Sequence, residues 1–443
     1  MGLPQQWQVR RIGGTLPDLA RILSANADGF VWLDSADSEH PTGQRSYIGA
    51  NMGSGWAGRT CGLDQLPALP LGAADEPTNG PGYQPGYFVA LNYESTQALV
   101  LVPDVVVVQE HGQLWLYHSY EATLPQELAG QEVAGQEVAA RGGNSAGDPA
   151  SLGLQAPVPD VRRDQYAAMI ARCHELIAAG QCAQLCLTTS WRTTLSDDTL
   201  SDGTLSDDTL SDGAVLDLYL RLRAHSPTPM ASLWNIDNTA FLSASPERFL
   251  EVTSDGKVQV NPIKGTRGRG VSPAEDAAIV AELAASKKDF EENRMIVDIM
   301  CEDLCQVCRP GSVQVSQLCE VHTFSDAHQL ISTVEGQLRP GVGAVDVVQA
   351  CMPPGSMTGA PKARAVKALH VLEPQRRGWY SGVAGHITAD GAADFSVLIR
   401  TVVVDGGELS YGVGGAITAL SDTAAELEEV GVKLRPFRKL LCF

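Results

Sequence analysis

Two pairs of acidic residues stand three positions apart in segments with helical periodicity. Asp289 precedes Glu292 in one segment, and Glu426 precedes Glu429 in the other. Residues three apart share one face of a helix, so two such helices that meet would present four carboxylates. Oxygen ligands of this kind suit Mg2+. Each pair alone is typical of a solvated helix face, and Thr423 with Glu426 also forms a capping-box pattern.

A Gly-rich segment at 355–362 has the sequence Gly-Ser-Met-Thr-Gly-Ala-Pro-Lys and leads into an expected helix. It departs from a nucleotide-binding phosphate loop because Ala360 and Pro361 separate the second glycine from the lysine. Pro361 suits the first position of a helix, where free backbone N–H groups attract anions. The segment is therefore expected to bind a carboxylate rather than a nucleotide.

Three of the ten cysteines, Cys301, Cys305 and Cys308, have the spacing of a [4Fe–4S] ligand set. They continue the periodicity of residues 295–300, which predicts the end of a helix. A cluster needs a loop that can wrap around it, so packed, reduced thiols are the favoured interpretation.

The composition limits the possible partners. The 443 residues carry 32 Lys plus Arg against 52 Asp plus Glu, a net charge of −20, which excludes bulk attraction to nucleic acid or to an anionic membrane. The most apolar run, 99–108, is interrupted by Pro103, whereas a bilayer helix needs about 20 apolar residues. No export signal is visible at the N-terminus, and a cytoplasmic location is expected.

The chain divides by pattern into three regions. Residues 1–125 are expected to be β-rich, with strands at 30–34, 46–49, 87–91, 105–108 and 114–117. Residues 126–160 repeat Ala-Gly-Gln-Glu-Val and then become rich in Gly, Ser and Pro, as in a linker. Residues 161–438 form the remaining domain. Its acidic insertion at 195–213 repeats with a five-residue period that fits no calcium-binding loop, so a solvated loop is expected.

Helical and strand patterns in the third region are grouped rather than alternating, which favours an α+β fold. Strands are expected at 181–191, 230–234, 240–243, 249–252, 385–388, 395–404 and 408–413. Helices are expected at 166–179, 215–224, 273–284, 289–307, 345–350, 361–372 and 423–434.

A series of ordered motifs between about 166 and 434 resembles the chorismate-utilising enzymes. WLDS at 32–35 and SYIG at 46–49 resemble the N-terminal part of that family. The fold implied by the resemblance has two large packed β-sheets with helices outside, around a chorismate cleft. The motifs of the catalytic region include SPERF at 245–249, PIKGT at 262–266, ENRMIVD at 292–298, HQLIS at 328–332, PGSMTGAPK at 354–362, LEPQR at 372–376 and GVGG at 412–415.

Within the family, Lys264 resembles the branch of aminodeoxychorismate synthase component I, because anthranilate synthases typically carry Ala between Pro-Ile and Gly-Thr. Members that add water to chorismate carry a lysine base at the position of Gln184. A glutamine cannot deprotonate water, so the resemblance implies ammonia as the nucleophile.

The resemblance also implies roles for individual residues. Lys264 would attack C2 of the ring while Glu247 protonates the departing C4 hydroxyl, and ammonia would then displace the lysine at C4 without loss of pyruvate. Mg2+ is the implied cofactor, held by the two acidic pairs. Many members carry His in place of Gln329 and Tyr in place of His386. The substrate contacts implied are Gln184, Gly265, Thr266, Gln329, Thr358, His386, Arg400, Gly414, Gly415 and Lys433.

None of the ten cysteines lies in the Gly-x-Cys-x-Gly elbow of a glutaminase. A separate glutamine amidotransferase subunit is therefore the expected partner that supplies ammonia. The expected product is 4-amino-4-deoxychorismate, a precursor of para-aminobenzoate for folate or antibiotic synthesis. Three alternatives stay open: an anthranilate synthase component I that releases pyruvate, a catalytically impaired chorismate-binding homologue, and a radical-SAM enzyme.

Overall fold

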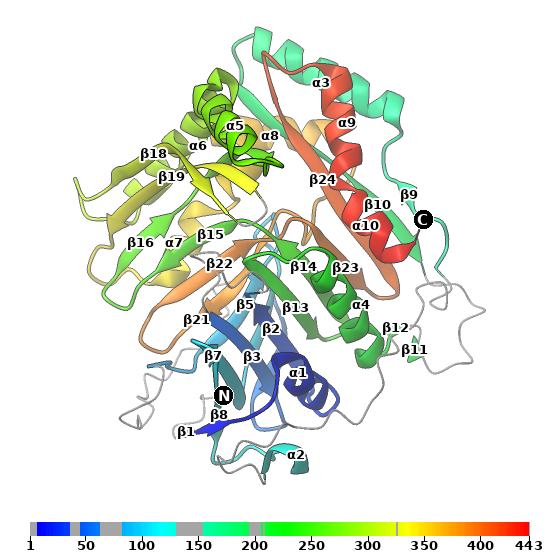
Figure 1. Cartoon of the computed structure of the whole chain (residues 1–443), viewed down its shortest axis with the longest axis vertical. Helices are drawn as coiled ribbons and strands as arrows, with labels where there is room; N and C mark the ends of the chain where they lie inside the picture. Colours follow the sequence, from blue (N-terminus) through cyan, green and yellow to red (C-terminus); the bar gives the residue numbers. More distant parts are fainter. Residues whose placement is uncertain are drawn as a thin grey trace.

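The computed structural model describes residues 7–35, 45–62, 82–129, 154–194, 205–206, 209–324 and 327–442. Two large antiparallel sheets pack together, and helices cover their outer faces (Figure 1). This architecture confirms the predicted α+β fold with two packed sheets.

Sheet A has 12 strands in the order β1-β8-β7-β3-β2-β13-β14-β23-β24-β10-β20, with β9 paired to β10. A separate two-stranded ribbon joins β11 (Leu205–Ser206) to β12 (Thr209–Leu210). The strands of sheet A are β1 (Trp7–Ile12), β2 (Gly29–Asp34), β3 (Arg45–Asn51), β7 (Val105–Glu110), β8 (Gln113–Ser119), β9 (Val158–Pro159), β10 (Gln184–Thr194), β13 (Met230–Ile236), β14 (Thr239–Ser245), β20 (Gly359–Ala360), β23 (Thr401–Asp405) and β24 (Glu408–Thr418).

Sheet B has 10 strands in the order β17-β19-β16-β15-β22-β21-β5-β6-β4, with β18 paired to β19. Its strands are β4 (Trp56–Thr60), β5 (Tyr87–Leu91), β6 (Ala98–Val102), β15 (Arg248–Val252), β16 (Lys257–Val260), β17 (Ile263–Gly268), β18 (Gln314–Thr323), β19 (Ala327–Gln337), β21 (Val383–Ile387) and β22 (Ala393–Val397).

The helices lie outside the sheets, and several begin at a side chain that caps the free N–H groups of the first turn. Ser286 caps α6 by accepting from the backbone N–H of Asp289, and Asp422 caps α9 in the same way from Ala425. Asp422, rather than Thr423, is therefore the N-cap of α9. The helices are α1 (Leu16–Ser24), α2 (Gln126–Ala129), α3 (Arg163–Ala178), α4 (Asp212–His225), α5 (Pro273–Ala285), α6 (Lys287–Cys305), α7 (Ala344–Cys351), α8 (Lys362–Leu372), α9 (Thr423–Lys433) and α10 (Arg435–Leu441), and a 3₁₀ turn spans Gly355–Met357.

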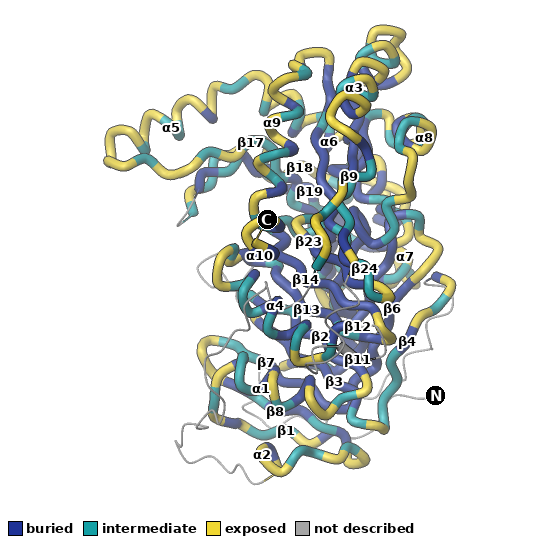
Figure 2. Tube along the Cα trace, turned by 90° about the vertical axis from the view of Figure 1, so that its right-hand side faces the viewer, coloured by how far each residue is buried: buried dark blue, intermediate teal, exposed yellow. Residues whose placement is uncertain are grey.

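Three apolar layers hold the molecule together. The middle layer joins the inner faces of the sheets through side chains such as Val31 and Trp234 of sheet A and Phe88 of sheet B. The outer layers pack sheet A against α1, α3, α4, α9 and α10, and sheet B against α6 and α7. Figure 2 shows the buried strands at the centre, with α5 extending from the body; only Leu283 of α5 is buried.

Strands from both ends of the chain share the two sheets. In sheet A, β2 pairs with β13, and in sheet B, β5 pairs with β21. The predicted boundaries at 125 and 160 stay a prediction. Most of the expected linker, 130–153, and residues 195–204 and 207–208 of the acidic insertion lie outside the described residues.

The single strand expected at 395–404 is wrong. The chain leaves sheet B after β22 and enters sheet A at β23, and residues 398–400 make the crossing. Arg400 has a φ of 50°, a left-handed conformation that interrupts a strand. The apolar side chains on both sides of the crossing hide this break in the sequence.

None of the described helices combines the length and apolar character needed to cross a membrane.

Candidate active site

A cleft of about 620 Å³ opens between the Gly-rich part of β24, strand β17 and helices α6 and α9. In Figure 1, α6 and α9 lie in the upper half of the molecule, and β24 runs beside α9. The volume suits a small organic ligand. The predicted site residues that line the cleft are Glu247, Lys264, Gly265, Thr266, Asp289, Glu292, Gln329, Arg400, Gly414, Gly415, Glu429 and Lys433.

Lys264 lies on β17, where the pairing with β19 slips by one residue. The register passes from Lys264 opposite Leu330 to Thr266 opposite Gln329, leaving Gly265 unpaired between them. Gly265 has a φ of 76°, and a Cβ there would lie 2.8 Å from Cγ of Asp289. Glycine is therefore required for α6 to pack this closely against the bulge that carries Lys264.

Glu247 lies in the short connection between β14 and β15. Its backbone carbonyl accepts from the N–H of Val397, and Ser245 Oγ donates to the carbonyl of Val397 at 2.7 Å. Burial raises the pKa of the Glu247 carboxyl, and the adjacent Ser356 hydroxyl and Lys264 oppose the rise. A raised pKa favours a carboxyl that can donate a proton.

Two cations in the cleft have no ion-pair partner among the described residues. Among the ion pairs of the described residues, none within 4.0 Å involves Lys264 or Arg400. An uncompensated cation in a cleft attracts an anionic ligand. Lys433 differs, because its Nζ lies 2.7 Å from Glu429 Oε1 and donates to the carbonyl of Gly414 at 2.7 Å.

The two glycines of β24 leave room for neighbours that a side chain would displace. A Cβ on Gly414 would lie 2.3 Å from the carbonyl oxygen of Leu187. A Cβ on Gly415 would lie 2.9 Å from Oε2 of Glu426 and 3.7 Å from Oε1 of Glu429. The close approach of β24 to α9 therefore depends on glycine at 415.

The acidic pairs of α6 and α9 lie at the same end of the cleft. Burial raises the pKa of Glu292, and the charges of Asp289 and Glu426 raise it further. Burial also raises the pKa of Glu426, with Glu429 adding to the rise. The neighbouring carboxylates therefore disfavour the charges of Glu292 and Glu426. Glu429 differs, because Lys433 and the other nearby lysines outweigh the effect of burial and hold its pKa below the usual value.

This donor set fits a divalent cation that takes further ligands from a substrate. Within the described residues, no three His, Cys, Asp or Glu side chains form a closed metal site. Glu292 Oε1, however, is buried and accepts no hydrogen bond from the described residues, and its nearest cation is Lys288 Nζ at 3.8 Å. A buried carboxylate oxygen without a hydrogen bond is costly. Asp289 instead accepts from Arg267 at 2.9 Å and from Ser286 at 2.7 Å.

Gln184 and Thr358 are fully buried and lie behind the cleft wall. Thr358 Oγ1 donates to the carbonyl of Gly355 at 3.1 Å. Gln184 shares a strand face with Cys186, which does line the cleft, because side chains two apart on a strand point the same way. Both polar atoms of the Gln184 amide lack a hydrogen-bond partner among the described residues.

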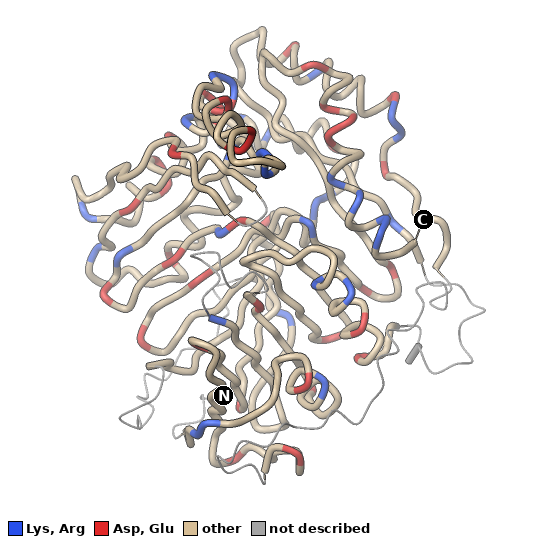
Figure 3. The backbone as a smooth tube through the Cα atoms, viewed as in Figure 1, with Lys and Arg blue, Asp and Glu red and all other residues tan. Residues whose placement is uncertain are grey.

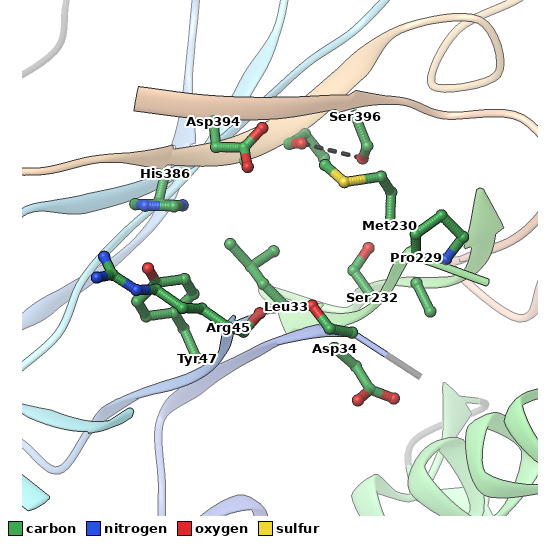
Figure 4. A pocket seen from close by; sticks show the side chains of 14 residues that line it. Leu33, Asp34, Arg45, Tyr47, Pro229, Met230, Ser232, His386, Asp394 and Ser396 are labelled. Carbon is green, nitrogen blue, oxygen red and sulfur yellow. Dashed lines mark hydrogen bonds between the residues drawn. The ribbon is translucent and has the colours of Figure 1, made fainter. Parts of the chain in front are cut away.

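The structure does not bring His386 to this cleft, which corrects the expectation that it contacts the substrate. Figure 4 shows His386 in a second cavity, of about 40 Å³, with Arg45, Tyr47 and Asp394. Its ring centroid lies 4.6 Å from that of Tyr47. Side chains two positions apart on a strand point the same way, so His386 shares the face of β21 that carries Ala384. This inner face packs on sheet A.

Several residues that line the cleft were not predicted. Cys186, Tyr380 and Tyr411 form part of its wall. Burial raises the pKa of the Cys186 thiol, which favours its protonated, unreactive form. Their places next to motifs could have indicated the two tyrosines, because Tyr411 directly precedes GVGG and Tyr380 follows shortly after LEPQR. The remaining unpredicted residues near the carboxylates are Lys288, Arg267 and Ser286.

Cys301 and Cys305 lie on the last turns of α6 and Cys308 follows the helix, as the periodicity predicted. All three are free thiols, and they are not grouped as metal ligands within the described part of the chain.

The family model for chorismate binding enzyme matches residues 81–439. The chain is 44% identical over 279 residues to an aminodeoxychorismate synthase of Streptomyces griseus, covering 63% of this chain and 36% of that protein. It is 37% identical over 293 residues to anthranilate synthase component 1 of Streptomyces coelicolor, covering 66% of this chain and 54% of the relative. The chain thus spans about a third of the length of the first of these relatives.

Two further similarities are to a separate synthase component and to a solved structure. The chain is 35% identical over 282 residues to aminodeoxychorismate synthase component 1 of Escherichia coli, covering 64% of this chain and 58% of that one. The structure of MenF, the menaquinone-specific isochorismate synthase of Escherichia coli, superposes with a TM-score of 0.71 at 17% identity, covering 100% of this chain and 96% of MenF. At 17% identity, the similarity to MenF shows a shared fold and no more.

Proposed function

Because this chain belongs to the chorismate binding enzyme family, we propose that its cleft binds chorismate and replaces the C4 hydroxyl with an amine from ammonia. The product would be 4-amino-4-deoxychorismate. The observation that carries the proposal is the placement of Lys264 and Glu247 in one cleft with an unpaired Arg400. The similarity to aminodeoxychorismate synthases at 44% identity supports the choice of reaction.

Binding of the substrate dianion would rest on the cations of the cleft. Arg400 offers a guanidinium without an acidic partner among the described ion pairs, and Lys433 lines the same cleft while donating to the carbonyl of Gly414. Guanidinium groups bind carboxylates through two parallel hydrogen bonds. Mg2+, held by Glu292 and Glu429, would supply positive charge for a substrate carboxylate when bound.

The chemical step would begin with the amine of Lys264 forming a bond to C2 of the ring. As the ring double bond shifts, the C4–O bond breaks and Glu247 gives its proton to the departing hydroxyl, which leaves as water. Ammonia then bonds to C4, the C2–N bond to Lys264 breaks with its electron pair returning to the lysine nitrogen, and the new C4 ammonium gives one proton back to Glu247. The net reaction exchanges one hydroxyl for one amine and releases no pyruvate.

Glu247 is suited to this role because burial raises its pKa, so a larger fraction of the carboxyl is protonated at neutral pH. Gln329 Oε1 is a buried acceptor without a partner among the described residues. It would accept a hydrogen bond from the substrate or from the incoming ammonia.

A separate glutamine amidotransferase would supply the ammonia. The Escherichia coli relative is a component 1, which supports a partner subunit for this chain. The chain alone is expected to use ammonium and to release no glutamate from glutamine. A cytoplasmic location and a role in folate or antibiotic precursor supply remain predictions of the same proposal.

Anthranilate formation is the second candidate, because the chain is also 37% identical to an anthranilate synthase component 1. One experiment separates the two. The purified chain is incubated with chorismate, MgCl2 and ammonium chloride at slightly alkaline pH, and products are identified by mass spectrometry alongside a pyruvate assay. Aminodeoxychorismate without pyruvate supports the proposal, whereas anthranilate with equimolar pyruvate would establish the alternative. Bound but unchanged chorismate would indicate an impaired homologue.

A further inference from the structure

Two lysines occupy the acidic end of the cleft. Lys433 Nζ lies 2.7 Å from Oε1 of Glu429, and Lys288 Nζ lies 3.8 Å from Oε1 of Glu292. In each pair the two residues are four positions apart on the same helix, which is α9 for Glu429 and Lys433 and α6 for Lys288 and Glu292. Glutamate before lysine is the favourable order for such a pair and lysine before glutamate the weaker one, which agrees with the shorter distance at Lys433.

Lys288 compensates more than its nearest carboxylate. Its charge lowers the pKa values of Glu426 and Glu429 as well as that of Glu292, opposing the effect of burial. Its distance to Glu292 is too long for a hydrogen bond, and no other group in the described part of the chain donates a hydrogen bond to Glu292 Oε1. The ammonium therefore acts through space, and half of the side chain remains exposed (50%), so it can move into solvent.

At the acidic end of the cleft, each acidic pair has an ammonium beside it: Lys288 lies beside Glu292 and Lys433 beside Glu429. A divalent cation bound there alone would add positive charge next to two lysines, and a dianion alone would add negative charge next to the carboxylates. Uncompensated charge in a cleft of reduced dielectric is costly.

We propose that Lys288 and Lys433 are resident counter-ions for the metal-site carboxylates, and that they make the binding of Mg2+ and of the dianionic substrate mutually favourable. The proposal rests on the function proposed above. Once a divalent cation compensates Glu429, the ammonium of Lys433 becomes available to a substrate carboxylate, and Lys288 is released from Glu292. The charge of each ligand thereby offsets the charge that the other brings.

Thermodynamic linkage makes this coupling reciprocal. Chorismate should tighten divalent-cation binding by at least about fivefold, the low end of typical coupling, and the cation should tighten chorismate binding by the same factor. The Lys288→Gln variant removes a competitor for the carboxylates. It should bind the cation more tightly than wild type when chorismate is absent and should show a smaller coupling factor.

The test measures Mn2+ binding by electron paramagnetic resonance, with and without chorismate. Three proteins are compared: wild type, Lys288→Gln, and the control Lys287→Gln, which removes an exposed charge from the same helix outside the cleft. A Mn2+ affinity that rises about fivefold or more only in Lys288→Gln supports the proposal. Equal affinities in the two variants, weaker binding in Lys288→Gln, or a wild-type coupling factor of one would overturn it.

This result can be separated from the fate of the proposed reaction. If amination is observed but the two lysine variants bind Mn2+ alike, the counter-ion role is wrong and the proposed function stands. If no amination occurs while Mn2+ binding responds to Lys288 and chorismate as described, the counter-ion role stands and the proposed reaction fails.

Discussion

Lys362 Nζ lies 2.6 Å from Oδ2 of Asp303. This buried ion pair links helix α6, which carries Asp303, to the end of the Gly-rich segment, where Lys362 lies. Lys362 also donates to the carbonyl of Cys351 at 2.8 Å. The side chains are 15% and 6% exposed, so neither charge has much access to water. The pair therefore holds the wall that carries Ser356 and Met357 against the helix that carries Glu292.

Asp303→Asn should destabilise the protein by about 3–5 kcal/mol, because it leaves the Lys362 ammonium buried without its counter-charge. Urea unfolding measures the difference. The double variant Asp303→Leu with Lys362→Met should recover much of the loss, since it removes both charges at once. A single variant as stable as wild type would show that Lys362 reaches water, contrary to the structure.

The dependence of stability on pH should report His386. Burial lowers the pKa of this ring from 6.5 to about 4, so between these values the unfolded chain binds a proton that the folded chain does not. Stability therefore rises with pH across this window and falls as the pH drops from 6.5 toward 4. Between pH 7 and pH 5 the loss should be about 2 kcal/mol.

His386→Gln removes that titration, so its unfolding free energy should change less between pH 7 and pH 5 than that of wild type. Urea unfolding at the two pH values measures both differences. The same pH dependence in both proteins would show that other groups cause it.

The metal-site carboxylates should matter for activity and little for stability. Glu292→Gln and Glu429→Gln each remove a ligand charge, so Mg2+-dependent turnover should fall at least about tenfold, a loss of about 1.4 kcal/mol in transition-state stabilisation. Burial and nearby carboxylates already disfavour the charge of Glu292, so the unfolding free energy of the Glu292→Gln variant should not be lower than that of wild type. Glu428→Gln, exposed on the same helix as Glu429, is the control. Turnover of wild type in EDTA would refute the assignment.

Gly415 should be needed for divalent-cation binding. A Cβ there would crowd Glu426 and Glu429, so Gly415→Ala should weaken Mn2+ binding. The control is Gly431→Ala on α9, where a Cβ meets nothing within 4 Å and should stabilise the helix by about 0.5–1 kcal/mol. Equal Mn2+ affinities in the two variants would mean that the carboxylates can move away from the new methyl group without loss of Mn2+ binding.

The sequence predicted most elements because their patterns are local. Tyr166, Ile170 and Cys173 recur at helical spacing, and all three are buried on α3. The break before β23 was missed because it depends on the backbone conformation of Arg400 and on a change of sheet, which leave no periodic signal. His386 was misplaced because motif position does not say which face of a strand a residue occupies, and neighbouring residues face opposite ways.

The cleft was predicted largely through motif resemblance. Periodicity put Asp289 and Glu292 on one helix face, but only the folded chain brings α6 beside α9 and β17. The partners of the acidic residues were not predictable, because Arg267 and Lys288 reach them across a bulge and a helix turn. Long-range contacts of this kind follow from tertiary packing rather than from spacing.

The product formed by Lys264→Ala tests the central claim most directly. Wild type, this variant and the control Lys367→Ala on α8 are given chorismate, MgCl2 and ammonium chloride, and products are quantified by mass spectrometry. If Lys264 bonds to C2, C4 amination should fall at least about 10²-fold in Lys264→Ala, the scale expected when a positioned catalytic group is lost, with traces of a C2-amino product or anthranilate. Near-normal formation of aminodeoxychorismate by Lys264→Ala would contradict covalent catalysis by this lysine.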